Sequence, residues 1–183
     1  MIISIYNGSP RKNGNTAFAT QQIFRQLENL RNGQIKLYNI SDYKIDPCYG
    51  CRQCMELYHC CNQKDDFEIL FHTVRNSDIT IWGVPVYWFA PPGITKNFID
   101  RTHGYFLDKG LLTGKRAYLV NIATDSGFRT NEAVMRSWLE WLGVKIVEVM
   151  DVYATETDDI KNDELKIKQI NRFIKNIIKE IAK

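Results

Sequence analysis

Short apolar runs and amphipathic segments with helical spacing alternate five times along this chain. The apolar runs predict strands over residues 2–6, 34–40, 78–84, 117–122 and 144–152. The segments that follow them predict helices over 15–30 and 67–74, through 98–101, and over 132–142 and 167–181. This alternation favours parallel strands, because each helix carries the chain back to the same end of the sheet. We therefore expect a doubly wound five-stranded parallel sheet with helices on both faces.

Length and composition limit the classes of protein that fit. The 183 residues match one domain, expected to span 1–183 with a cysteine-rich loop at about 47–64. A hydrophobic share of 44% argues against disorder, and a net charge of +3 from scattered Lys and Arg argues against a nucleic-acid partner. No run reaches the roughly 18 apolar residues of a membrane helix, and the first residues lack a basic signal region. We expect a cytoplasmic protein with no membrane attachment.

The turn after the first expected strand has the composition of an anion site. It reads Gly8-Ser9-Pro10-Arg11-Lys12-Asn13-Gly14-Asn15-Thr16 and opens the first helix. Hydroxyl, amide and backbone N–H groups that converge on a helix N-terminus bind phosphate well. No lysine stands where a nucleoside-triphosphate loop needs one, and the glycine pattern of a dinucleotide fold is absent. The turn therefore favours a single phosphate monoester.

Two more turns lie where a doubly wound sheet binds ligands, at the carboxyl ends of its strands. The loop after the third strand, residues 85–93, carries Tyr87, Trp88 and Phe89 consecutively between prolines, as expected of a wall against a flat ring. Residues 124–127 follow the fourth strand and offer N–H groups to a ligand rim. A phosphate cradle and an aromatic wall at one sheet edge predict a flavin mononucleotide (FMN) pocket.

All five cysteines lie between Cys48 and Cys61. A cytosolic chain rarely uses disulfides as structural links, so this grouping indicates metal binding or redox chemistry. Three alternatives stay open beside an iron–sulfur cluster: a redox-active thiol pair, a zinc site, or burial as small apolar side chains.

Three segments together resemble the NAD(P)H-dependent FMN reductase family. The first is the turn at 8–16. The second is one signature in two parts, Pro85-Val86-Tyr87-Trp88 followed by Lys96-Asn97-Phe98-Ile99-Asp100-Arg101. The third is the run Cys48-x-x-Cys51-x-x-Cys54, which resembles that of the family's iron–sulfur flavoprotein branch. The resemblance implies a flavodoxin-like fold and frequent homo-oligomers. It implies phosphate contacts from Ser9, Arg11, Asn13, Asn15 and Thr16, and ring or ribityl contacts from Pro85, Val86, Tyr87 and Trp88. Thr124 and Gly127 would complete the ring edge, where Asp125 departs from the small neutral residues of the family. Residues 96–101 would support the loop without contacting FMN.

The same resemblance implies that Cys48, Cys51, Cys54 and either Cys60 or Cys61 could hold a [4Fe–4S] cluster. No catalytic side chain is expected, because the cofactor carries the chemistry. Of the three histidines, His59 is expected on a loop and His72 on a helix, while His103 either caps a helix or lines the substrate mouth.

We expect electron transfer from NAD(P)H through FMN to a quinone, flavin, metal ion or iron–sulfur partner. Two alternatives compete with this hypothesis. One is an electron carrier that holds FMN, with or without a cluster, and acts only with protein partners. The other is a cysteine-based redox or metal sensor without flavin.

Overall fold

Five parallel strands form one sheet in a computed structural model that describes residues 1–28, 30, 33–56 and 61–182. The strands are β1 (Ile2–Asn7), β2 (Gln34–Asn39), β3 (Ile79–Pro85), β4 (Arg116–Ala123) and β5 (Lys145–Tyr153). Their order across the sheet is β2-β1-β3-β4-β5, with every neighbouring pair parallel. The prediction of a five-stranded parallel sheet is confirmed.

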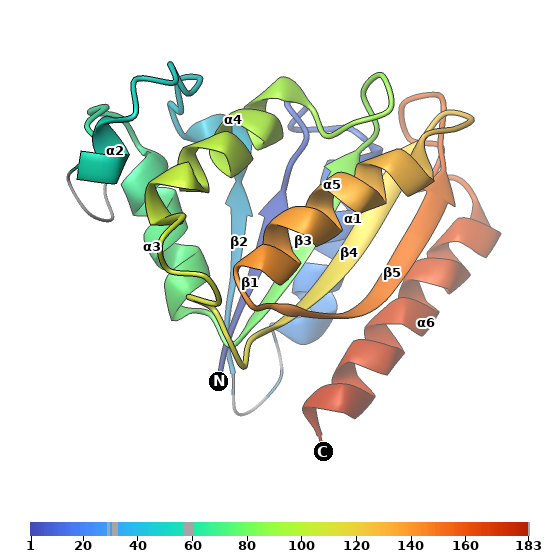
Figure 1. Ribbon diagram of the computed structural model, residues 1–183. Helices are drawn as coiled ribbons and strands as arrows, with labels where there is room; N and C mark the ends of the chain where they lie inside the picture. Colours follow the sequence, from blue (N-terminus) through green and yellow to red (C-terminus); the bar gives the residue numbers. More distant parts are fainter. Residues whose placement is uncertain (29, 31–32, 57–60, 183) are drawn as a thin grey trace.

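Helices cover both faces of this sheet (Figure 1). They are α1 (Asn15–Leu27), α2 (Gln53–Glu56), α3 (Phe67–Asn76), α4 (Gly93–Arg101), α5 (Phe128–Trp141) and α6 (Glu164–Ile181), with short 3-10 turns η1 (Ile40–Asp42) and η2 (Thr102–Tyr105). One apolar core joins α1 and α6 to one face, and a second joins α3, α4 and α5 to the other. Among the described residues, each helix is too short or too polar to cross a lipid bilayer.

The central strand β3 determines where a ligand can sit. All seven of its residues are buried, since it pairs with β1 on one side and β4 on the other. The chain winds from β1 outward to β2 and then crosses to β3, so the winding direction reverses between β1 and β3. At such a reversal the loops separate, and a crevice opens at the carboxyl ends of the strands.

Several boundaries differ from those predicted. Helix α5 begins at Phe128, four residues before the predicted start at 132, because Gly127 adopts φ +89° and the chain turns directly into the helix. The apolar pattern did not predict this start, because most residues in the first turn of α5 are polar. The predicted helix stripe at 67–74 is also wrong at Ile69, which is 60% exposed. The short elements α2, η1 and η2 were not predicted.

Candidate functional site

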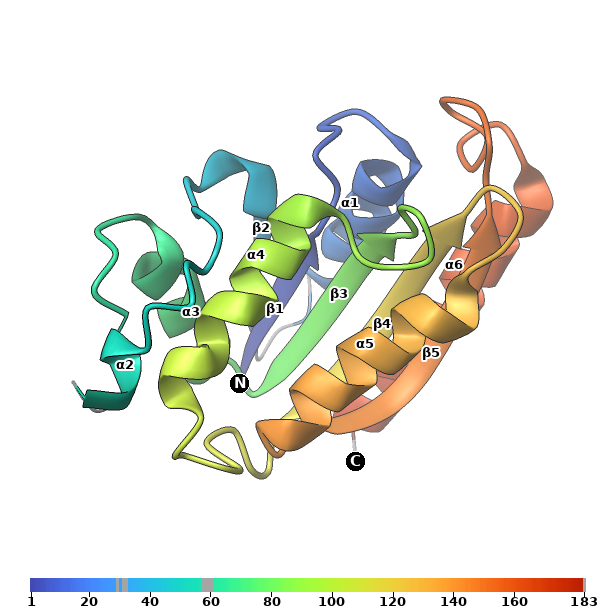
Figure 2. The same cartoon turned by 45° about the horizontal axis from the view of Figure 1, so that its top comes forward.

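The loops that follow β1, β3, β4 and β5 meet at one edge of the sheet (Figure 2). They surround a cavity of about 170 Å³. Eight residues predicted as cofactor contacts line it: Ser9, Arg11, Asn15, Thr16, Pro85, Val86, Tyr87 and Thr124. The three turns singled out in the sequence therefore come together in space.

Hydrogen bonds shape the turn between β1 and α1. The Ser9 N–H donates to Asn7 Oδ1 at 3.1 Å, and Ser9 Oγ accepts from the Arg11 N–H at 3.1 Å. Thr95 closes the other side by donating its hydroxyl to the Gly8 carbonyl at 2.9 Å. Helix α1 then begins after Gly14, which provides no side-chain cap, so its first N–H groups stay available for an anion.

The side chain of Asn15, one of the predicted phosphate contacts, is hydrogen-bonded to another loop. Its Nδ2 donates to the Glu156 carbonyl at 2.8 Å, and its Oδ1 accepts from the Ile160 N–H at 3.2 Å. Both ends of the amide therefore bind the loop between β5 and α6, although the residue still lines the cavity. Asn13 lies outside this cavity and borders a separate hollow beside α1. Lys12 forms an ion pair with Asp42 at 2.5 Å.

The aromatic loop after β3 is a tight hairpin. Tyr87 and Ala90 exchange backbone hydrogen bonds of 2.8 and 3.2 Å around a two-residue turn. Trp88 and Phe89 have φ +48° and +67°, positive at both central positions as a type I′ turn requires, where Asn-Gly is the usual pair. Trp88 does not line the cavity and is 92% exposed. Such strain at non-glycine residues is typical of functional sites.

Gly127 packs against the hairpin and does not line the cavity itself. A Cβ at Gly127 would lie 2.7 Å from Val86 Cγ1 and 3.3 Å from Phe89 Cα. The β4–α5 turn can approach the hairpin this closely only with glycine at that position. Asp125, in the same turn, accepts a hydrogen bond from the Ser126 hydroxyl at 2.9 Å and does not line the cavity.

Sequence reasoning missed the fourth wall of the cavity. Thr155 and Thr157, from the loop after β5, line it together with Ala154. The signal was present, because hydroxyl residues directly follow the last strand, at the same carboxyl edge as the three turns that were considered.

The cysteine loop lies beside α4, on the α3–α5 face of the sheet. Cys48 and Cys51 are exposed, Cys54 and Cys61 are half-buried, and these four form no disulfide. Partial burial raises the pKa of the Cys54 thiol, and repulsion from the other three described thiols raises this pKa further. Cys60 and His59 lie outside the described residues. Within the described ranges, no three Cys, His, Asp or Glu side chains are already arranged around a common metal position.

A buried ion pair anchors this loop. The Arg101 and Asp65 side chains are 1% and 2% exposed, and they form a two-pronged contact of 2.5 and 3.1 Å. Burial alone raises the pKa of Asp65, but hydrogen bonds from Arg101 and from two backbone N–H groups outweigh it and hold this pKa below its ordinary value. Arg101 thus holds the cysteine loop, not the 85–93 loop that residues 96–101 were expected to support, and it does not line the cavity.

Comparison with known proteins decides the family. The sequence pattern described as NADPH-dependent FMN reductase matches residues 1–158. The chain belongs to this family. Its FMN reductase fold also resembles that of the azoreductase AzrA, with a TM-score of 0.76 at 10% identity, covering 96% of this chain and 98% of that one. The flavodoxin-like fold is therefore confirmed.

Curated relatives of this FMN reductase family member carry two kinds of name. An iron–sulfur flavoprotein of Clostridioides difficile (strain 630) is 36% identical over 104 residues, 56% of this chain and 46% of the relative. An FMN-dependent NADH:quinone oxidoreductase of Pelagibacter ubique (strain HTCC1062) is 30% identical over 122 residues, 60% of this chain and 61% of the relative. The chain thus spans about half the length of the iron–sulfur flavoprotein. The family description and the names of both relatives refer to flavin-dependent proteins.

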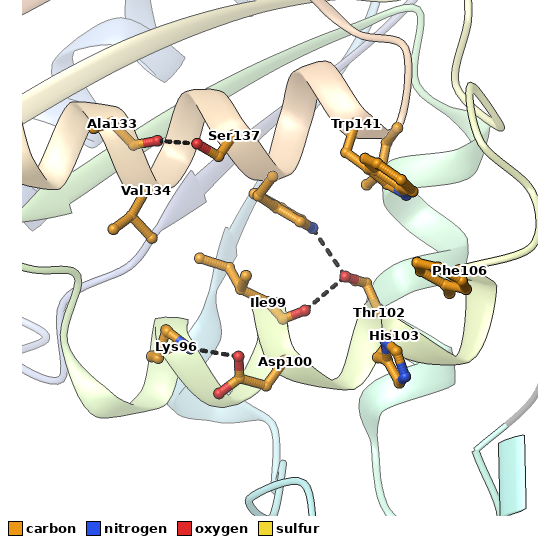
Figure 3. Close-up of a pocket in the computed structure, with 12 residues that line it drawn as sticks. Lys96, Ile99, Asp100, Thr102, His103, Phe106, Ala133, Val134, Ser137 and Trp141 are labelled. Carbon is orange, nitrogen blue, oxygen red and sulfur yellow. Dashed lines mark hydrogen bonds and ion pairs between the residues drawn. The ribbon is translucent and has the colours of Figure 1, made fainter. Parts of the chain in front are cut away.

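A larger groove of this FMN reductase family member lies away from the sheet edge, between α4, η2 and α5 (Figure 3). It has a volume of about 610 Å³. Phe106 and Trp141 stack at one end with ring centroids 5.6 Å apart, and Lys96 pairs with Asp100 at the other. His103 lines this groove and not the cavity at the sheet edge.

Proposed function

We propose that this protein oxidises NAD(P)H through FMN bound in the cavity at the carboxyl ends of β1, β3 and β4. The start of α1, the aromatic hairpin and the β4–α5 turn all line one cavity, and this observation supports the proposal most directly. FMN, when bound, accepts a hydride from the nicotinamide and passes electrons on to an acceptor.

The chain's own residues divide into two groups around this proposed ligand. Ser9, Thr16 and the first N–H groups of α1 form a neutral cradle for the phosphate, and Arg11 adds a positive charge beside it. Pro85, Val86 and Tyr87 form the wall for the ring, with Thr124 at its edge. Asn13, Trp88 and Gly127 do not line the cavity, so we propose no direct contact with FMN from their side chains. Asn13 and Gly127 would fix the conformation of their loops, and Trp88 would present an exposed ring at the rim of the cavity.

Thr16→Val tests the phosphate cradle. Thr16 is 3% exposed and lines the cavity, so the change removes a hydroxyl that we expect to donate to the phosphate while keeping the side-chain shape. A hydrogen bond to a charged group contributes about 1.5–3 kcal/mol, which corresponds to a loss of affinity of about tenfold or more. Fluorescence titration of the FMN-free protein with FMN measures the dissociation constant.

Thr20→Val is the matched control for that experiment. Thr20 lies one turn further along α1, and its hydroxyl donates to the Thr16 and Ala17 carbonyls at 2.9 and 3.0 Å. It does not line the cavity, so FMN affinity should stay within about twofold of the wild type. An equal loss in both variants would contradict the cradle.

We further propose that the cysteine loop holds a [4Fe–4S] cluster and that the acceptor takes electrons one at a time. Cys54 and the three other free thiols within its electrostatic reach are suitable donors for such a cluster. The iron–sulfur flavoprotein name of the relative supports the same assignment. A cluster, when held, exchanges single electrons, whereas a quinone acceptor would take them in pairs directly from FMN.

Anaerobic purification followed by titration with NADH and NADPH tests both proposals. We expect a flavin spectrum above a broad iron–sulfur shoulder, and we expect one nicotinamide to bleach the flavin. A protein that carries both chromophores, reacts with a reduced ferredoxin and never bleaches with either nicotinamide would instead be the electron carrier. A colourless protein that cannot be reconstituted with FMN would favour the thiol sensor.

We also propose a homo-oligomer. The exposed aromatic rings of Trp88 and Phe89 at the rim of the cavity support contact with a second copy, because large apolar side chains are rarely left in solvent together. Light scattering of the wild type and of Trp88→Ser gives the test: the variant should dissociate at concentrations where the wild type does not.

A further inference from the structure

A series of polar contacts starts and ends in the turn between β1 and α1. The Ser9 N–H donates to Asn7 Oδ1 at 3.1 Å, and Asn7 Nδ2 donates to Asn39 Oδ1 at 3.2 Å. Asn39 Nδ2 donates to Asp42 Oδ2 at 3.0 Å, and Asp42 Oδ1 lies 2.5 Å from the Lys12 ammonium. These five residues form a polar network that leaves the turn at residue 9, crosses to the end of β2 and to η1, and returns to the turn at residue 12.

Strand pairing places the two asparagines of the polar network side by side. Asn7 and Asn39 are the last residues of β1 and β2, and they are partners in the register of these strands. Asn7 is fully buried, so a hydrogen bond left unmade at its amide would be costly. Among the described residues, β2 and η1 contribute nothing to the lining of the cavity, yet they hold the turn that does line it.

The direction of the hydrogen bonds is set from both ends of the polar network. The Ser9 N–H can only donate, so Asn7 must present its oxygen to it and its nitrogen to Asn39. At the other end an ionised carboxylate can only accept. The Lys12 ammonium and then the Asn39 amide hold the pKa of Asp42 below its ordinary value, which keeps this acceptor ionised. Each amide therefore has one orientation that satisfies all of its partners.

The polar network also determines which charge reaches the cavity. Arg11 lies inside the enclosed stretch, and its N–H donates to Ser9 Oγ at 3.1 Å. Arg11 is the one charged side chain among the described residues that line the cavity, whereas Lys12 borders the separate hollow beside α1. A phosphate monoester carries a charge of about −1.5 to −2 at pH 7, so neutral donors in fixed positions must meet the remainder. The shape of the turn is therefore decisive for binding.

We propose that Asn39 and Asp42 are positioning residues for phosphate recognition. They act through the polar network on the shape of the turn at 8–16. This inference rests on the proposed binding of FMN in the cavity. Neither residue lines the cavity, so neither would contact the ligand. Loss of the polar network should weaken binding of the phosphate and leave the contacts of the flavin ring unchanged.

Asn39→Leu breaks the polar network at its centre while keeping a side chain of similar size. We expect the FMN dissociation constant to rise about tenfold, because Asn7 and Asp42 lose their partner and the turn loses its fixed shape. The dissociation constant of riboflavin, which has the same ring and no phosphate, should change by less than about twofold. Titration of the flavin-free protein, followed by flavin fluorescence, measures both constants. A merely structural role would weaken both flavins alike.

Asn176→Leu is the matched control. Asn176 Nδ2 donates to the Glu148 carboxylate at 3.0 and 3.2 Å, so this change also removes a partly buried amide from a carboxylate. Asn176 lies on α6 and does not line the cavity, so both flavins should bind within about twofold of the wild type. Urea denaturation should show similar losses of stability in the two variants. A loss of FMN affinity equal to that of Asn39→Leu would overturn the inference.

The double variant Asn39→Asp with Asp42→Asn exchanges the amide and the carboxylate of the polar network. The carboxylate at position 39 can accept from Asn7 Nδ2 and from the amide at position 42, whose oxygen can accept from Lys12. We expect this double variant to recover most of the FMN affinity. Asn39→Asp alone places two carboxylates together and should bind FMN at least as weakly as Asn39→Leu. Equally weak binding by the single and the double variant would overturn the inference.

The inference and the proposed function can fail separately. A wild type that binds neither FMN nor riboflavin would end the proposed function. A wild type that binds FMN, with an Asn39→Leu variant that loses affinity for both flavins alike or for neither, would overturn the role of the polar network and leave the proposed function intact.

Discussion

Arg101→Gln is expected to lower the free energy of unfolding by about 3–5 kcal/mol, the range for breaking a buried ion pair. The change leaves the Asp65 carboxylate charged, 2% exposed and without its cation. It also releases the Asp46 carbonyl from its guanidinium donor. Urea denaturation at pH 7, followed by far-ultraviolet circular dichroism, measures the loss.

An exposed arginine provides the control for this change. Arg136 pairs with Glu132 along α5 at 2.5 Å, with side chains 38% and 24% exposed. Solvent-screened helix pairs contribute only about 0.3–0.5 kcal/mol, so Arg136→Gln should have little effect. Similar losses in the two variants would show that burial is not what makes the Arg101 pair important.

The penalty of Arg101→Gln should also depend on pH. The pKa of Asp65 is held below its ordinary value in the folded chain, so the carboxylate binds its proton more readily when the chain is unfolded. The stability from this group is fully present above the unfolded pKa of about 3.9 and is lost as the pH falls through the folded pKa. The difference between wild type and variant should therefore shrink below about pH 4. A difference that stays constant to pH 3 would contradict the assignment.

Gly83→Ala should separate α1 from the sheet. A Cβ at this position of β3 would overlap the methyl group of Thr20 and lie 3.2 Å from the methyl group of Thr16. Overpacking of this kind costs about 1–3 kcal/mol. Because Thr16 belongs to the proposed phosphate cradle, we expect FMN affinity to fall together with the free energy of unfolding. Urea denaturation and FMN titration measure the two effects.

The double variant Gly83→Ala with Thr20→Ser distinguishes this clash from other causes. Serine lacks the overlapping methyl group but keeps the hydroxyl that donates to the Thr16 and Ala17 carbonyls. Most of the lost stability should return in the double variant, whereas Thr20→Ser alone should change it little. If the free energy of unfolding does not recover in the double variant, the clash with the Thr20 methyl group is not the cause of the loss.

The fold could be predicted because its signals are local. Each buried strand is a continuous apolar run, and each helix that packs on the sheet carries an apolar stripe, so the order of elements follows from short windows of sequence. The start of α5 was missed because its first turn is polar and one of those residues, Asn131, is fully buried by bonding Asn121 across the core. The pattern of apolar residues carries no trace of such a polar contact.

In the candidate site, too, the contiguous segments could be predicted from the sequence and the long-range contacts could not. The turn at 8–16 and the aromatic hairpin could be identified because each is contiguous and follows a strand. The hydrogen bond from Asn15 to Glu156 could not be predicted from the sequence, because the two residues are 141 positions apart. The Arg101–Asp65 pair likewise joins residues 36 positions apart, and nothing near either one indicates its partner.

The two hydrogen bonds of Asn15 bear on where the functional unit ends. The family match stops at residue 158, yet Asn15 Oδ1 binds the N–H of Ile160, whose side chain is fully buried. The segment that leads into α6 is thus fastened to the first turn of α1, where the proposed phosphate lies. A shorter version of the protein trimmed to the family boundary would lose the Ile160 end of this link, so the segment that leads into α6 supports the turn where the proposed phosphate lies.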